Sequence, residues 1–201
     1  MVLSAPDLHS IRQYLHVSAA FIREWVRSPR TMGMVCPSGT SLAHAMAAGV
    51  PLGTGGLVVE LGAGTGAVTQ ELLRAGVAPH RLLIVEKAPG MTRLLQQRFP
   101  QLQIVQGDAT ALPSFIPPSR RVDCIISSLP LVSLGETTRE ALIRAMHASL
   151  GEGGLLVQYT YSWSSSNPFL TRGFQCVDSQ RVWDNVPPAR VFRFVRRAYV
   201  N

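Results

Sequence analysis

The sequence predicts an α/β fold in which a mostly parallel sheet is covered by helices on both faces. The first observation is residues 58–66, where a short apolar strand runs into Glu60 and then into glycines at alternate positions. The second is a series of further apolar runs, each ending in polar or acidic residues, at 81–86, 102–109 and 121–128. Short continuous apolar runs are typical of strands buried on both faces of a parallel sheet.

The glycines of the first segment predict a sharp turn from a strand into a helix. Gly62, Gly64 and Gly66 let the backbone turn and approach a ligand closely, which a Cβ would obstruct. A helix is predicted over about 67–74, ending at Gly76, because glycine is favoured just past a helix C-terminus. The segment resembles the cofactor loop of an S-adenosyl-L-methionine (SAM) methyltransferase.

The same loop also fits a looser pattern for dinucleotides. Gly62, Gly64 and Ala67 match G-x-G-x-x-A, so glycine spacing alone does not separate SAM from a nicotinamide cofactor. Three features favour SAM: Glu60 two residues before the first glycine, the third glycine at position 66, and about 55 residues of chain before the strand. A dinucleotide remains the alternative for this loop.

Acidic residues stand at the ends of the next two predicted strands. Glu86 ends the run 81–86, and Asp108 follows the run that begins at residue 102. The resemblance to SAM methyltransferases implies that Glu86 accepts the ribose hydroxyls and that Asp108 contacts the adenine amino group. The residues predicted to bind SAM and its product S-adenosyl-L-homocysteine are Glu60, Gly62, Ala63, Gly64, Gly66, Glu86, Lys87, Asp108, Ala109 and Ser127.

Length and composition indicate one globular domain. The chain has 201 residues, of which 46% are hydrophobic and 15% charged. No apolar run approaches the roughly 18 residues needed to span a bilayer, and no signal peptide is evident, so a cytosolic protein, or one on a surface facing the cytosol, is expected. Cys36, Cys124 and Cys176 are odd in number and lack metal-ligand spacing, so we expect free thiols and no zinc.

The charge balance points to a polyanionic partner. The formal net charge is +7, and Lys87 is the single lysine among 19 basic residues. Arginine holds phosphate through a planar fork of donors, whereas lysine acts as a point charge. Nucleic acid and an anionic membrane surface are both candidates at this point.

A long amphipathic helix is predicted over about 5–27. Its aliphatic residues recur at helical spacing. Tyr14, Phe21 and Trp25 lie along one flank of that stripe, and basic side chains lie along the other. This arrangement suits the headgroup boundary of a membrane. Packing of the helix on its own domain explains the stripe equally well, so both interpretations stay open.

Taken together, the segments resemble the short bacterial phospholipid N-methyltransferases, which methylate phosphatidylethanolamine with SAM and are remotely similar to ribosomal RNA adenine dimethylases. The likeness covers nearly the whole chain and rests on the SAM loop and on residues 37–43 with Met46, 127–131, 158–161 and 185–191. It implies a Rossmann-like seven-stranded SAM methyltransferase fold, with an N-terminal helical extension over 1–50 and a SAM-binding core over 51–201.

The function that this resemblance implies is stepwise N-methylation of phosphatidylethanolamine toward phosphatidylcholine. The protein would be cytoplasmic and peripherally associated with the inner face of the cytoplasmic membrane. The membrane contact would be made by the N-terminal helix and basic residues on an anionic surface. No metal is expected.

Two other substrates remain as alternatives. Related enzymes methylate ornithine lipids. Adenine N6-methyltransferases of RNA and DNA carry Asn-Leu-Pro-aromatic or Asn-Pro-Pro-aromatic after the fourth strand, where the amide holds the target amine and the ring stacks on the base. Ser128 and Leu131 replace the asparagine and the aromatic residue here. The amide that holds the amine and the ring that stacks on the base are therefore both missing. A phospholipid is therefore favoured over nucleic acid.

The side chains expected to serve the amine are Tyr159, Tyr161 and Ser128. The tyrosines lie at the end of a predicted fifth strand over 154–161, and their rings could hold a methylated cation by cation–π attraction. Packing without a catalytic role is the alternative for either ring. Because side chains alternate along a strand, we expect the two rings to face different sides unless both lie past its end.

The last part of the chain is predicted to form two antiparallel strands, over 173–177 and 191–199, joined by a loop that contains Pro187 and Pro188. Asn185 and this loop could close over the substrate cleft, by inference from the resemblance. Four arginines gather in this region, and they are expected either to contact lipid phosphate or to form a solvated face: Arg190, Arg193, Arg196 and Arg197.

Overall fold

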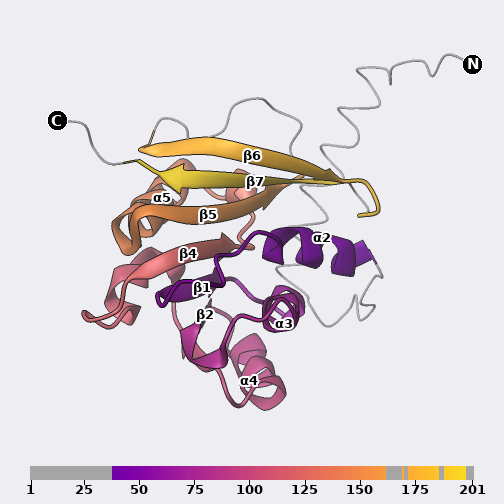
Figure 1. Ribbon diagram of the computed structural model, residues 1–201, viewed down its shortest axis with the longest axis vertical. Helices are drawn as coiled ribbons and strands as arrows, with labels where there is room; N and C mark the ends of the chain where they lie inside the picture. The colour runs from indigo at the N-terminus through magenta and orange to yellow at the C-terminus, as the bar shows by residue number, and fades with distance from the viewer. Residues whose placement is uncertain (1–37, 162–168, 170–171, 186–187, 198–201) are drawn as a thin grey trace, which may run out of the picture.

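The computed structural model describes residues 38–161, 169, 172–185 and 188–197, and they form one seven-stranded sheet. The strand order is β3-β2-β1-β4-β5-β7-β6; β7 runs antiparallel to β5 and β6, and the other neighbouring strands pair in parallel (Figure 1). The strands are β1 (Leu57–Leu61), β2 (Leu82–Glu86), β3 (Gln103–Gln106), β4 (Val122–Ser127), β5 (Leu150–Thr160), β6 (Phe174–Val182) and β7 (Ala189–Arg196). The predicted seven-stranded, mostly parallel α/β fold is confirmed.

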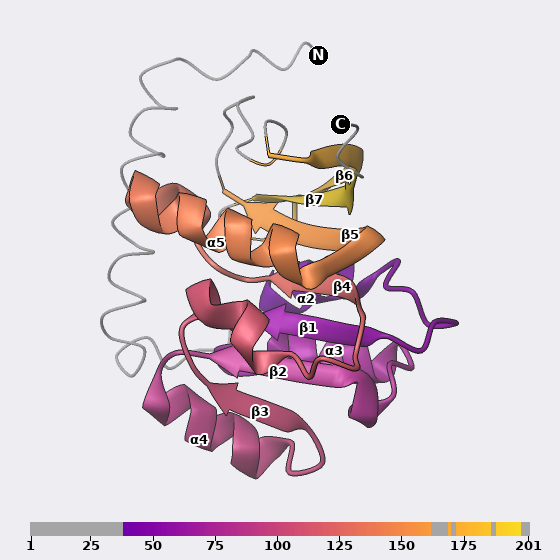
Figure 2. The ribbon, with the colours of Figure 1, turned by 90° about the vertical axis from the view of Figure 1, so that its left-hand side faces the viewer.

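Helices cover both faces of the sheet, as expected from β1 and β2, which are buried at every position. The helices α2 (Ser38–Ala47), α3 (Ala67–Arg74) and α4 (Pro89–Arg98) pack on one face. On the other face lie α5 (Glu136–Ser149) and the 3₁₀ helix η2 (Ala109–Phe115). Figure 2 shows α5 in front of the sheet and α2 and α3 behind it. Two further 3₁₀ turns are η1 (Pro79–Arg81) and η3 (Leu131–Ser133).

Several element boundaries differ from those predicted. The helix over 67–74 is confirmed, and Gly76 follows it with a φ of 97°. The strand β5 begins at Leu150 rather than at residue 154, and β6 extends to Val182 rather than ending at 177. A register shift between Cys176 and Asp178 explains the second difference, because a bulge interrupts the apolar alternation that reveals a strand. The helix predicted over 5–27 lies outside the described residues.

The described residues offer no disulfide, metal cluster or membrane span. Cys124 is buried and Cys176 half-buried, and both are free thiols as predicted, whereas Cys36 lies outside the described residues. No group of three or more metal-ligating side chains occurs in the described part of the chain. Within the same residues, no helix is long and apolar enough to cross a bilayer.

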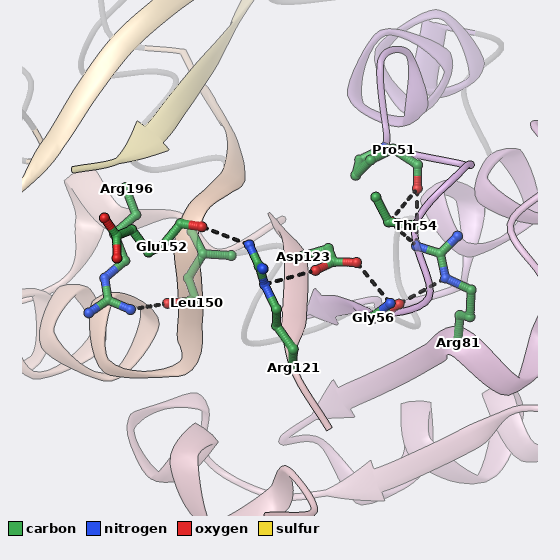
Figure 3. Close-up of polar contacts among 9 residues, drawn as sticks. All are labelled: Pro51, Thr54, Gly56, Arg81, Arg121, Asp123, Leu150, Glu152 and Arg196. Atoms are coloured by element: carbon green, nitrogen blue, oxygen red, sulfur yellow. Dashed lines mark hydrogen bonds and ion pairs between the residues drawn. The ribbon is translucent and has the colours of Figure 1, made fainter. Parts of the chain in front are cut away.

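A buried arginine fixes the segment that leads into β1. Arg81 is 5% exposed, and its guanidinium donates hydrogen bonds to three backbone carbonyls. Its Nε donates to the Gly56 carbonyl at 2.8 Å, and its two terminal nitrogens donate to the carbonyls of Leu52 at 2.9 Å and Pro51 at 3.0 Å. Nη2 also donates to Thr54 Oγ1 at 2.9 Å (Figure 3). The loop between α2 and β1 therefore takes its shape from one guanidinium.

Further polar contacts at the same edge join the beginnings of β1, β4 and β5. The Gly56 N–H donates to Asp123 Oδ2 at 2.8 Å, and a Cβ at Gly56 would lie 2.3 Å from that oxygen. Arg121 pairs with Asp123 at 3.2 Å and donates to the Glu152 carbonyl at 2.7 Å (Figure 3). Arg196 on β7 donates to the carbonyl of Leu150. The amino ends of the central strands are thus tied together by side chains.

Replacing Arg81 with lysine should destabilise the fold strongly. A lysine has one nitrogen and cannot reach carbonyls on three residues, so buried acceptors lose their donors. We expect the free energy of unfolding to fall by about 2 to 4 kcal/mol in urea titrations. The matched control is Arg121→Lys, because the side chain of Arg121 is 63% exposed. The free energy of unfolding of this variant should fall by less than about 1 kcal/mol. Equal losses in the two variants would contradict the role given to Arg81.

Candidate functional site

The loop after β1 is a tight turn that only glycine can make. Gly62 and Gly66 have φ values of 70° and 84°, in the left-handed region. A Cβ at Gly62 would lie 2.7 Å from Leu129 Cδ2, and one at Gly66 would lie 2.5 Å from the Phe99 ring. Gly64 is also left-handed, with a φ of 55°. The predicted turn is therefore present, and α3 starts directly after it.

Backbone hydrogen bonds bring the loops after four strands to one edge of the sheet. The Gly62 N–H donates to the Val85 carbonyl at 2.9 Å, and the Ser128 N–H donates to the Leu61 carbonyl at 2.9 Å. The Gly107 N–H donates to the Glu86 carbonyl at 3.0 Å. The carboxyl ends of β1, β2, β3 and β4 consequently meet, and crevices at such an edge are where open α/β sheets bind ligands.

Glu86 stands at this edge with both carboxylate oxygens engaged by backbone amides. Oε2 accepts from the Gly64 N–H at 3.0 Å, and Oε1 accepts from the Ala88 N–H at 2.8 Å. Each oxygen has a second lone pair, so the carboxylate can still accept hydrogen bonds from ligand hydroxyls. Glu86 therefore links the glycine loop to the end of β2 and retains acceptor capacity.

Asp108 lies beside Lys87 one strand further along the edge. Lys87 Nζ is 2.8 Å from Asp108 Oδ2, and Oδ1 accepts from the N–H and the hydroxyl of Thr110 at 2.9 and 2.8 Å. The hydrogen bond from Lys87, followed by those from Thr110, lowers the pKa of Asp108 to about 2. The same pair raises the pKa of Lys87. Asp108 is therefore an ionised acceptor at neutral pH, and Ala109 beside it is buried.

Glu60 is fully buried under the glycine loop. Its Oε2 accepts from the Thr69 hydroxyl of α3 at 2.6 Å, whereas its Oε1 has no hydrogen-bond partner among the described residues. Burial raises the pKa of this carboxyl to about 7. The hydroxyl of Ser127, also fully buried, likewise has no partner among the described residues. Two unsatisfied polar atoms therefore lie at the carboxyl ends of neighbouring strands, where a polar ligand could satisfy them.

The three residues predicted for the amine lie together at the carboxyl ends of β4 and β5. The Tyr159 hydroxyl is 3.5 Å from the Ser128 carbonyl, and the rings of Tyr159 and Tyr161 meet edge to face with centroids 5.3 Å apart. Burial raises the pKa of both hydroxyls. The expectation that the rings face different sides is wrong, because residues two apart on a strand share a face. Asn185 donates to the Tyr161 hydroxyl at 3.3 Å.

Gln158 is a polar residue of this site that was not predicted to have a role. It is 4% exposed, and its Nε2 donates to the carbonyls of Leu129 at 3.1 Å and Tyr159 at 2.8 Å. The loop after β4 is thereby fastened to the end of β5, next to the two tyrosines. The sequence did hold a sign of this role, because an amide side chain inside an otherwise apolar strand needs hydrogen-bond partners within the protein.

The four C-terminal arginines do not act as one group. Arg193 donates to the carbonyls of Ala45 at 2.7 Å and Ala48 at 3.1 Å, and it pairs with Asp178 at 2.6 Å. Arg196 donates to the Leu150 carbonyl. For these two residues, the expectation of a phosphate contact or a solvated face is wrong, since both brace the fold. Arg197 donates to Gln175, and Arg190 lies apart from the others near the end of β5.

Glu60 should make stability depend on pH. A carboxyl whose pKa is raised on folding binds its proton more tightly in the folded state, so stability falls as pH rises from its ordinary pKa through about 7. We expect the free energy of unfolding of wild type, relative to Glu60→Gln, to drop by on the order of 2 kcal/mol between pH 5 and 8. Urea titrations across that range measure it. A pH-independent difference between the two proteins would contradict the buried-acid description.

Comparisons with known proteins find similar methyltransferases. A family model described as a methyltransferase domain matches residues 58–154. The chain is 26% identical over 177 residues to an ornithine lipid N-methyltransferase of Singulisphaera acidiphila, and the match covers 86% of this chain and 92% of that enzyme. It is 36% identical over 88 residues to ribosomal RNA small subunit methyltransferase A of Synechococcus sp., covering 42% of this chain and 29% of that enzyme.

A solved structure with a bound cofactor has the same fold. The glycopeptide N-methyltransferase MtfA, complexed with SAM, aligns with a TM-score of 0.62 at 16% identity, over 79% of this chain and 94% of that one. The glycine loop with its left-handed turns, the acceptors at three strand ends and the unsatisfied buried oxygens fit a SAM molecule. These findings support a SAM-dependent class I methyltransferase, with SAM as the cofactor.

Proposed function

We propose that the protein methylates the primary amine of a membrane amino lipid, with phosphatidylethanolamine as the favoured substrate and phosphatidylcholine as the final product of stepwise transfer. The observation that carries the proposal is the pair of tyrosine rings at the carboxyl end of β5, beside the Ser128 carbonyl. The similarity to an ornithine lipid N-methyltransferase over most of both chains supports a lipid amine and makes ornithine lipid the second candidate. The net charge of +7 favours an anionic membrane surface as the place of reaction.

The residues proposed to hold SAM are those at the carboxyl edge of β1 to β4. Glu86 would accept the ribose hydroxyls, and Asp108 the adenine amino group. The loop with Gly62, Ala63, Gly64 and Gly66 would pass close to the methionine part, with Glu60 and Ser127 beneath it. When bound there, SAM supplies an electrophilic methyl group on a sulfonium.

The tyrosine site is suited to a neutral amine nucleophile. The amine must lose its ammonium proton before it can attack, and burial favours the uncharged form. The carbonyl of Ser128 can accept a hydrogen bond from the amine and orient it. Because burial raises the pKa of Tyr159, its hydroxyl stays protonated at neutral pH and positions the amine rather than removing its proton. The two rings can hold the cationic product by cation–π attraction.

Methylation of adenine in RNA is the alternative, and the partial match to a ribosomal RNA methyltransferase is the observation that favours it. The loop after β4 offers little to a base. Leu131 is 5% exposed and packs in the core, so it offers no stacking surface. Ser128 cannot offer the two-way hydrogen bonding of an asparagine amide. The match also spans less than a third of that enzyme.

Labelled SAM should place its methyl group on lipid. We expect label in mono-, di- or trimethylated ethanolamine lipid when the protein is incubated with mixed phosphatidylethanolamine and phosphatidylglycerol liposomes. Parallel incubations contain ornithine lipid liposomes or total ribosomal RNA, and lipid and RNA are separated before counting. Label in ornithine lipid alone would show that ornithine lipid, the second candidate, is the substrate. Label in RNA alone would overturn the lipid proposal.

Changing Tyr159 to phenylalanine should lower turnover about tenfold while leaving SAM affinity unchanged. The ring is kept, but the hydroxyl that lies 3.5 Å from Ser128 is lost. Calorimetry measures SAM affinity, and initial rates with lipid micelles give kcat and KM. The comparison variant is Tyr161→Phe, whose hydroxyl contacts Asn185. Wild-type turnover in Tyr159→Phe would mean that the Tyr159 hydroxyl has no part in the reaction and that the residue only packs.

A further inference from the structure

The turn between β6 and β7 lies at the same edge of the sheet as the candidate site. β6 runs in the same direction as β5, because both strands pair antiparallel with β7. Near the end of β6, Arg181 lies opposite Arg190, which in turn lies opposite Thr160 at the end of β5. The turn that follows Val182 therefore projects from the carboxyl edge, about 10 Å from β5, or two strand spacings (Figure 1).

Buried residues anchor this turn to the domain. Val182 and Ala189, on its two sides, are buried in the core on the α2 face. Asn185 is also buried, and its amide donates to the Tyr161 hydroxyl at 3.3 Å. The turn is therefore held in place next to the residues proposed for the amine.

Trp183 is exposed on this anchored turn. It is 59% exposed, which is the highest fraction among the large hydrophobic residues of the described part of the chain. A tryptophan combines an apolar ring system with one N–H donor, and such residues are enriched at the headgroup level of membranes. Single exposed apolar residues are common on protein surfaces, so the neighbours of Trp183 decide what it can bind.

Two arginines flank Trp183. The Arg181 guanidinium lies 5.5 Å from the centroid of the Trp183 ring, and Arg190 is directly opposite Arg181 in the hairpin. The Arg190 guanidinium lies 4.6 Å from the centroid of the Phe192 ring. The residues from 183 to 188 contain one carboxylate, Asp184, so positive charge exceeds negative charge in this group. An exposed aromatic ring beside basic side chains is complementary to an anionic lipid surface.

The hollow beside Trp183 offers no pocket for a nucleobase. It lies among Trp183, Pro188 and Arg190 and has a volume of about 40 Å³. One water needs about 10 to 15 Å³ on the same measure, so the hollow holds only a few waters. A lipid surface needs no pocket, because it is met by side chains that project from the protein. A bilayer is therefore favoured over a flipped base as the partner of this turn.

The basic residues of the turn and the amine residues lie on opposite faces of the sheet. Arg190 is two residues from Phe192, which packs on the α5 face. Tyr159 and Tyr161 pack on the α2 face. One headgroup therefore cannot reach from the tyrosines to the arginines. A bilayer is broad enough to meet the whole carboxyl edge, so the turn would contact lipids other than the one that is methylated.

We propose that the β6–β7 turn is a docking surface for an anionic phospholipid bilayer, with Trp183 in the headgroup layer and Arg181 and Arg190 level with the phosphates of surrounding lipids. The inference rests on the proposed lipid function and names the part of the protein that meets the membrane. Docking at this turn directs the carboxyl edge of the sheet toward the bilayer. The contact between Asn185 and Tyr161 then keeps the amine residues at a fixed position relative to the lipid surface.

The fluorescence of Trp183 tests the contact directly. The chain has three tryptophans, so replacing Trp25 and Trp163 with phenylalanine leaves Trp183 as the single reporter. With liposomes of phosphatidylethanolamine and phosphatidylglycerol, we expect its emission to shift to shorter wavelength and its quenching by aqueous acrylamide to fall. Lipids brominated close to the headgroup should quench it more than lipids brominated near the chain ends. Unchanged emission and unchanged acrylamide quenching would overturn the docking surface.

A second test compares Trp183→Ser with Leu52→Ser. Leu52 is 50% exposed, and its carbonyl accepts from Arg81 at the opposite edge of the sheet. We expect Trp183→Ser to weaken liposome binding about tenfold. Its SAM affinity, melting temperature and activity on monomeric short-chain phosphatidylethanolamine should be unchanged. Leu52→Ser should bind liposomes as wild type does, and an equal loss in the two variants would contradict the proposal.

The charge of the turn is tested with Arg181→Gln and Arg190→Gln. The control is Arg93→Gln, because Arg93 is exposed on α4, which packs near the other end of the sheet. We expect each turn variant to bind phosphatidylglycerol liposomes about fivefold more weakly than wild type. On liposomes of phosphatidylcholine alone, the turn variants and wild type should bind alike. A loss of the same size in Arg93→Gln would show that only the overall charge matters and would contradict the role of the two arginines.

The docking surface and the lipid function can fail separately. Methyl label on lipid without a response of Trp183 to liposomes overturns the docking surface and leaves the lipid function standing. A response of Trp183 without label on either lipid supports the docking surface and contradicts the lipid function. A response to ribosomal RNA but not to liposomes assigns the turn to nucleic acid and overturns the proposal.

Discussion

The hydrogen bonds that the loop after β1 makes with its two neighbouring strands are the constraint on which the site depends. The Gly62 N–H bonds to β2, and the Leu61 carbonyl accepts from Ser128 after β4. These two bonds fix the glycine turn between Glu86 on one side and the Ser128 carbonyl on the other. The cofactor residues and the amine residues can therefore share one edge of the sheet, although they come from distant parts of the chain.

The two edges of the sheet have different polar chemistry, and the difference follows from their roles. At the amino edge, Arg81 and Asp123 are satisfied by backbone groups, so this edge is fixed. At the carboxyl edge, Glu60 is buried with one oxygen unpartnered among the described residues, and its pKa is raised to about 7. Such a group costs stability, which a ligand bound at the loop can restore.

Short sequence patterns predicted most of the central fold. They could not predict contacts between residues that lie far apart in the chain. The glycine turn, the helix after it and the strand ends at Glu86 and Asp108 are visible in short windows of sequence. Arg193 resembles a surface arginine in such a window, because its acceptors at Ala45 and Ala48 lie about 145 residues away. The strand β6 was predicted to end at residue 177, because the bulge between Cys176 and Asp178 interrupts its alternating pattern. The pairing of Arg181 with Arg190 required the register of the hairpin.

A crystal structure with S-adenosyl-L-homocysteine and a short-chain phosphatidylethanolamine tests the central claim most directly, because it locates the amine. The account predicts the amine nitrogen within hydrogen-bond distance of the Ser128 carbonyl and against the rings of Tyr159 and Tyr161. An amine bound elsewhere on the sheet edge, with the tyrosine rings packed only against each other, would contradict the account.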